Sequence, residues 1–172
     1  MTYPFFIDMT FVDDSPNPLS EVKELALSYI APRGLATPEL FVMGTEDDRA
    51  LWCKALEWVM GFGQQADRAT IMPVGWNVRN LVWPAFVAHV AAAKGDRGFC
   101  DLLPGYLLQQ KEKRWSNVDM VDVANLVMQG GYTQEPLKLE DAAWFFLGEK
   151  LDAEATAADR LWKVYDIYTK YV

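Results

Sequence analysis

Apolar residues near the start of the chain fall in short runs of the length and spacing typical of β-strands. The run from Tyr3 to Phe11 is apolar and aromatic around Asp8, which predicts a buried strand carrying one carboxylate. The apolar period of Glu21 to Ile30 fits a strand or a helix. Turn-forming residues fill Asp13 to Pro18, so we favour a second strand over Leu25 to Ile30, antiparallel to the first. Leu40 to Met43 predicts a short third strand.

A helical pattern replaces the strand pattern after Thr45, which is a suitable N-cap residue. Acidic side chains follow it, where the positive end of the helix dipole favours them. Gly61 and Gly63 predict that this helix ends near Met60. The apolar positions that share one face of the helix are Leu51, Trp52, Ala55, Leu56 and Val59.

The stretch from Pro73 to Lys94 links a predicted fourth strand, Ile71 to Trp76, to a second helix. Asn77 to Asn80 has the composition of a polar turn. We expect the helix to open near Pro84, because proline is tolerated in the first turn of a helix. A strand that enters a helix through an asparagine turn is also common in ordinary α/β proteins, so this pattern alone assigns no chemistry.

The remaining pattern is mostly helical. An extended stretch at 118–121 leads into a helix that ends before Gly130, and further helices are predicted at 137–147 and from Ala155 or Thr156 onward. Strands followed by helices interleaved with a strand predict an α/β fold in which helices pack on a mixed sheet. The length of 172 residues suits a single domain spanning 1–172.

Composition and charge narrow the class of partner. The chain contains seven Trp, seven Tyr and nine Phe, so we expect aromatic side chains on a partner-binding surface as well as in the core. The net charge of −8 disfavours tight non-specific binding to a phosphate backbone. No apolar run approaches the roughly 20 residues of a membrane span. No leader pattern opens the chain, and Cys53 and Cys100 lack metal-ligand spacing, so we expect a cytoplasmic protein without membrane contact.

Several segments resemble, in order, those of the 3′–5′ exonucleases related to the proofreading domain of family B DNA polymerases. Gly75, Asn77, Pro84 and Phe86 fit the frame of that family's second exonuclease motif. The other segments that carry the resemblance are FFIDMTF, VKELALSYI, TEDDRALWCKALEWV, SNVDMVDVANLV, LKLEDAAWFFLG and DRLWKVYDIYTKY. The resemblance spans nearly the whole chain and implies an RNase H-like fold with four metal-binding carboxylates of the DEDD type.

The resemblance also implies a two-metal site, in which carboxylates hold ions that activate a water and stabilise the leaving oxygen. Asp8 and Asp159 stand at two of the four carboxylate positions. Thr10 and Val82 occupy the other two, and neither replaces a carboxylate ligand. The family's water-positioning tyrosine or histidine would fall at Ala155 or Glu154. The resemblance therefore implies the family's fold with a decayed metal site.

Each candidate residue also has a purely structural interpretation. Asp8 is either a vestigial metal ligand or a strand carboxylate held by backbone N–H groups, whereas Asp159 suits the start of a helix. Asp119 and Asp122 either face the same cleft or cap the helix that follows them. Asn77 suits a turn residue that bonds its own backbone.

A basic cluster is the only feature that favours nucleic acid directly. Lys111, Lys113 and Arg114 with Trp115 would contact it through charge and stacking, or would form a solvated loop. The single histidine, His89, has no catalytic partner in the sequence. No nucleotide-binding, serine-hydrolase or zinc-protease motif occurs.

These observations predict a catalytically degenerate 3′–5′ exonuclease-like protein with a non-catalytic binding or assembly role. The acidic charge and the surplus of aromatic residues favour a protein partner or a homo-oligomer, with only weak binding to nucleic acid, and no cofactor is expected. The alternative is a weakly active exonuclease that acts on nucleic-acid ends and uses Asp8 and Asp159, with or without Asp119 or Asp122, around one Mg²⁺ or Mn²⁺ ion. A short single-domain relative of this kind would suit a virus or a mobile element.

Overall fold

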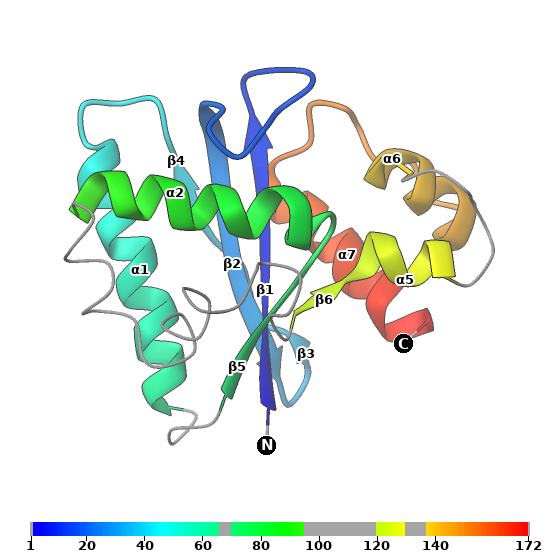
Figure 1. Cartoon of the computed structure of the whole chain (residues 1–172). Coiled ribbons are helices and arrows are strands. Elements are labelled where there is room, and N and C mark those ends of the chain that lie inside the picture. Colours follow the sequence, from blue (N-terminus) through cyan, green and yellow to red (C-terminus); the bar gives the residue numbers. More distant parts are fainter. Residues whose placement is uncertain (1, 66–69, 95–119, 130–136, 172) are drawn as a thin grey trace.

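The described part of the chain has three layers, with helices on both faces of a central sheet (Figure 1). The computed structural model describes residues 2–65, 70–94, 120–129 and 137–171. One face of the sheet is covered by α1 (Asp48–Gln65) and α2 (Trp83–Lys94). The other face is covered by α5 (Val123–Gln129), α6 (Leu139–Ala142) and α7 (Ala157–Tyr171). Among these residues, no helix combines the length and apolar character that crossing a membrane requires.

The sheet is mixed and has six strands, which confirms the predicted α/β class. Its central strand, β1 (Thr2–Phe11), pairs antiparallel with β2 (Val22–Ala31) and parallel with β5 (Thr70–Gly75). Beyond β5 lies the short parallel strand β6 (Val121–Asp122). The far side of β2 pairs antiparallel with β3 (Gly34–Leu35) and β4 (Glu39–Val42).

Side chains along β1 point alternately to the two faces of the sheet, and this alternation places the carboxylate of Asp8. Phe5, Ile7 and Met9 are buried against α1 and α2, whereas Phe6 is buried against α7. Residues two apart in a strand point the same way, so Asp8 shares the α7 face with Phe6. Its antiparallel neighbour on β2 is Ala26, whose small side chain leaves room beside the carboxylate.

α1 continues for five residues beyond the predicted end at Met60 and contains both Gly61 and Gly63. The cost of a helical glycine, about 1 kcal/mol relative to alanine, is outweighed here by packing. Phe62 lies between the two glycines, and its ring stacks on Trp58 and contacts Phe5 of β1. Tertiary contacts therefore override the local stop signal.

The polar turn predicted at 77–80 is wrong beyond its first residue. Asn77 does turn the chain, with a left-handed φ of 52°, but a π-helix, η1 (Val78–Val82), follows at once and runs directly into α2. Pro84 therefore lies inside a continuous helical segment. Proline has no N–H to donate to the preceding turn, and a widened π turn is one way in which a helix accommodates that loss.

The last helices lie close to their predicted positions. α6 and the π-helix η3 (Ala143–Leu147) together occupy most of the predicted 137–147 segment, and Gly148 ends them in a left-handed conformation with a φ of 66°. α7 begins one residue after Thr156, whose hydroxyl accepts the N–H of Asp159 and caps the helix.

Gly75→Ala is expected to destabilise the fold, because the added methyl group would lie 2.5 Å from the main-chain oxygen of Ile7. Overpacking of this kind costs about 1–3 kcal/mol in the free energy of unfolding, which urea denaturation measures. Gly61→Ala is the matched control, since its added methyl group has nothing within 4 Å, and it should stabilise α1 by roughly 0.5–1 kcal/mol. Equal stability of Gly75→Ala and the wild type would contradict the close approach of β1 and β5.

Candidate functional site

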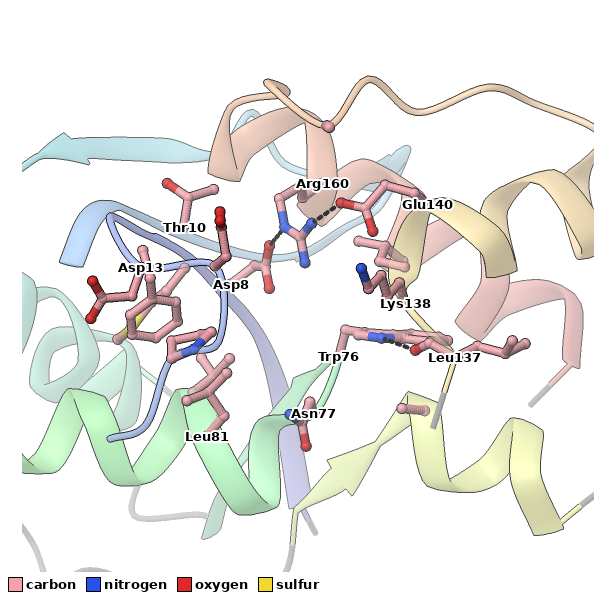
Figure 2. A pocket seen from close by; sticks show the side chains of 18 residues that line it. Asp8, Thr10, Asp13, Trp76, Asn77, Leu81, Leu137, Lys138, Glu140 and Arg160 are labelled. Carbon is pink, nitrogen blue, oxygen red and sulfur yellow. Dashed lines mark hydrogen bonds and ion pairs between the residues drawn. The ribbon is translucent and has the colours of Figure 1, made fainter. Parts of the chain in front are cut away.

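A cavity of about 420 Å³ lies beside the end of β1, between the β1–β2 turn, η1, and the α6–α7 side of the molecule (Figure 2). Both apolar and charged side chains line it. The charged side chains that line it are Asp8, Asp13, Asp14, Lys138, Glu140 and Arg160. Asp8, Thr10, Asn77 and Val82, which the sequence singles out, all line this cavity, so we take it as the candidate functional site.

Arg160 is the central side chain of the cavity wall. Its Nε donates to Oδ2 of Asp8 at 2.7 Å, and its Nη1 donates to Oε1 of Glu140 at 3.0 Å (Figure 2). Asp8 is only 1% exposed and the Arg160 side chain 18%, so the two charges meet largely out of water. The guanidinium therefore ties the central strand β1 to helices α6 and α7.

The start of α7 is held in place by a second carboxylate, one strand away. Glu24 on β2 accepts hydrogen bonds from the hydroxyl of Thr10 and from the N–H of Ala157, both at 3.2 Å. A carboxylate at a helix N-terminus also interacts favourably with the helix dipole. Because Glu24 fixes the first turn of α7, Arg160, three residues after Ala157, is directed at Asp8.

Burial and charge shape the ionisation of this pair. Burial raises the pKa of Asp8, and the Arg160 guanidinium offsets part of that rise. Burial alone would lower the pKa of Arg160, but the charges of Asp8 and Glu140 outweigh it and raise that pKa above its ordinary value. Arg160 is therefore a permanent cation. The second oxygen of Asp8, Oδ1, is buried and has no hydrogen-bond partner among the described residues.

The residues that the exonuclease resemblance singles out are divided between two places. Asp8, Thr10 and Val82 all line the cavity, with Val82 contributing an apolar wall. Asp159 is exposed and lines a separate surface hollow beside Trp162. The structure thus brings the first two motifs together and does not bring Asp159 to Asp8.

Asp122 has the capping role that was one of its two interpretations. Its carboxylate accepts the backbone N–H groups of Asn77, Arg79 and Ala124 at 3.1–3.2 Å, so it caps α5 and ties the β5–η1 turn to β6. Burial raises the pKa of Asp122, and these N–H donors offset part of the rise. Asn77 makes no side-chain capping bond, so its left-handed backbone rather than its amide explains its position.

The other candidate residues lie away from the cavity or outside the described residues. His89 stacks on Trp52 at a centroid distance of 4.9 Å, and its Nε2 lies 3.0 Å from the main-chain oxygen of Ser20, which is a structural contact. Cys53 is a free, partly buried thiol. The residues that lie outside the described part of the chain are Cys100, Lys111, Lys113, Arg114, Trp115 and Asp119.

Sequence reasoning missed Arg160 and Glu140 because it searched for metal-binding carboxylates. A signal for Arg160 was nevertheless present. It lies three residues after Ala157 and four before Val164, two buried positions of α7, so it falls on the apolar stripe of the helix. A charged residue on a buried stripe requires a partner of opposite charge.

The donor set does not fit the pair of divalent ions that the exonuclease resemblance implies. Hard divalent ions need several free oxygen ligands. One oxygen of Asp8 and one of Glu140 already accept hydrogen bonds from Arg160, and the hydroxyl of Thr10 donates to Glu24. Within the described ranges, no group of three or more His, Cys, Asp or Glu side chains could hold a metal ion.

No protein-family model matches this chain, and no curated protein matches it.

Arg160→Met is expected to destabilise the protein by about 3–5 kcal/mol at neutral pH, because it leaves Asp8 as a buried charge without a partner. The control Lys163→Met, on the same helix, breaks the ion pair with the half-exposed Glu149 and should cost less than about 1 kcal/mol. The double variant Asp8→Asn, Arg160→Met should recover much of the loss. Urea unfolding measures all three, and similar losses for the two Met variants would contradict a buried role for Arg160.

The loss of unfolding free energy caused by Arg160→Met should also become smaller as the pH falls. Without the guanidinium, the pKa of Asp8 rises further, so the folded variant binds a proton more tightly than the unfolded chain. Proton binding then favours the folded state, and stability rises as the pH falls toward the unfolded-state pKa of about 3.9. A loss that stays constant between neutral and mildly acidic pH would show that Asp8 is not the group left unpaired.

Proposed function

We propose that this chain is a catalytically degenerate relative of the 3′–5′ exonucleases, with an RNase H-like fold and a non-catalytic binding or assembly role. The observation that carries the proposal is the ion-pair cluster of Asp8, Arg160 and Glu140. The guanidinium of Arg160 pairs with carboxylate oxygens of Asp8 and Glu140. The exonuclease resemblance implies that Asp8 would instead bind a metal ion.

The arrangement of the sheet supports the fold part of the proposal. The first long strands are antiparallel, the later ones are parallel to β1, and helices cover both faces. The positions of the first two exonuclease motifs also lie together: Asp8 and Thr10 on β1 share one cavity with Asn77 after β5. This juxtaposition is what the resemblance implies for two motifs separated by more than sixty residues.

The charge of Arg160 explains why the cluster disfavours catalysis. Metal-assisted phosphodiester cleavage needs an ion that accepts oxygen lone pairs and activates water. A guanidinium has only N–H donors and no site that can bind a water oxygen as a Lewis acid does. It therefore neutralises Asp8 without supplying the chemistry of the ions.

A surface aromatic pair supports a protein partner. Trp144 and Phe145 of η3 are each 66% exposed, although their neighbours Ala143 and Phe146 are buried. Adjacent exposed aromatic side chains are typical of protein interfaces, where they anchor binding. The net charge of −8 favours a partner protein over a phosphate backbone. Fold alone does not identify that partner.

One observation favours the alternative of a weakly active, single-metal exonuclease. Oδ1 of Asp8 is buried without a partner, and a carboxylate oxygen is a suitable ligand for Mg²⁺ or Mn²⁺. The alternative requires Arg160 to move away from Asp8 when the ion binds. Metal titration and a digestion assay separate the two functions.

Calorimetric titration with Mg²⁺ and Mn²⁺, and digestion of an end-labelled single strand, should both give negative results for the wild-type chain. The physical reason is that Arg160 already engages one oxygen each of Asp8 and Glu140, which leaves too few free oxygen ligands for a divalent ion. Asp8→Ala provides the control, because any true activity of this site depends on that carboxylate. Metal binding at millimolar or lower concentration, together with digestion that Asp8→Ala abolishes, would establish the exonuclease instead.

A further inference from the structure

Acidic side chains outnumber basic ones in the cavity. Four carboxylates line it, on Asp8, Asp13, Asp14 and Glu140, against the two cations of Lys138 and Arg160. Arg160 is already engaged by Asp8 and Glu140. The cavity therefore attracts a positively charged ligand and repels an anion such as a phosphate group.

Two of these carboxylates have no cationic partner. Asp13 and Asp14 lie in the β1–β2 turn, are exposed, and make no ion pair with the part of the chain that the structure describes. They border the same cavity as Asp8, and Figure 2 shows Asp13 on the side away from Glu140 and Lys138. Asp13 and Asp14 are therefore the solvent-exposed carboxylates of the cavity lining, and Asp8 is the buried one.

The buried carboxylate supplies an independent indication of a ligand. Asp8 is 1% exposed and lines the cavity, yet its Oδ1 accepts no hydrogen bond from the part of the chain that the structure describes. A buried acceptor without a donor is unfavourable, and native proteins rarely leave one in that state. A donor carried into the cavity by a ligand would satisfy it, whereas an acceptor-only ligand would not.

The remaining walls suit the aliphatic stem of a long cationic side chain. Phe11, Leu81 and Leu137 line the cavity beside the acidic residues. Trp76 also lines it, and its indole N–H donates to the main-chain oxygen of Leu137 at 3.0 Å (Figure 2). Long basic side chains bury their methylene groups on such surfaces while the charged head meets carboxylates, and an aromatic wall adds cation–π attraction.

We infer that this cavity binds an arginine side chain presented by a basic segment of a protein partner, an inference that rests on the proposed binding function and specifies its ligand. A guanidinium carries five N–H donors in a planar fork, so it can bind two carboxylates of the cavity lining at once. A lysine ammonium fits the charge but lacks that fork.

Calorimetry of the full chain at low salt tests the inference with two short peptides, acetyl-Gly-Arg-Gly-amide and the same peptide with citrulline in place of arginine. Citrulline keeps the length and most of the shape of arginine but carries no charge. We expect the arginine peptide to bind at least about tenfold more tightly, because charge-assisted hydrogen bonds are the stronger ones. Absence of arginine-peptide binding, or equal binding of the two peptides, would overturn the inference.

A matched pair of double variants locates the binding. Asp13→Asn, Asp14→Asn removes the two unpaired carboxylates of the cavity and should weaken arginine-peptide binding by about tenfold or more. Glu46→Gln, Asp47→Asn changes the net charge equally at two exposed residues that precede α1, outside the cavity lining, and should leave the affinity nearly unchanged. Equal weakening by both pairs would mean that only the overall charge matters and would contradict a specific site.

The peptide experiments and the metal and digestion experiments test different claims, so the arginine ligand and the non-catalytic role can fail independently. Failure of the peptide titration, with no metal uptake and no digestion, would overturn the arginine ligand and leave the non-catalytic role standing. Metal uptake with digestion would overturn the non-catalytic role itself, whatever the peptide does.

Discussion

The ion pair between Asp8 and Arg160 is the constraint on which the rest of the site depends. It joins the central strand of the sheet to a helix near the end of the chain, and Glu140 extends it to α6. A buried pair of this kind adds little net stability, because desolvation offsets much of the attraction, but the loss of one partner is costly. We therefore expect its main consequence to be specificity, because packing of α7 on β1 is favoured where the guanidinium meets the carboxylate.

Two further carboxylates, those of Glu24 and Asp122, fix the elements around the ion pair. Glu24 fixes the first turn of α7, and Asp122 binds the turn that leads from β5 into η1. These two carboxylates thus stabilise the fold around the cavity, while Asp13 and Asp14 in its lining make no ion pair with the described residues. Apolar Val82 closes the wall where the exonuclease resemblance implies a further carboxylate. The proposed function interprets this site as an exonuclease-like framework in which an internal cation takes the place of the metal ions.

The sheet could be predicted from the sequence because strand signals are local. The apolar run around Asp8 and the turn cluster after Asp13 are enough to predict β1, β2 and their antiparallel pairing. The end of α1 and the turn after Asn77 could not be predicted, because Phe62 packing and the helical entry of η1 depend on distant contacts. The Asp8–Arg160 pair spans 152 positions and is visible only as a charged residue on an apolar stripe.

The most direct test of the account is the anomalous diffraction of crystals grown with Mn²⁺. The account predicts no manganese peak beside Asp8, with the Arg160 guanidinium still paired with Asp8 and Glu140. A manganese ion coordinated by Asp8 at roughly 2.0–2.6 Å, with the guanidinium displaced, would contradict it. Arg160 would then be a movable side chain beside a working metal site rather than its permanent replacement.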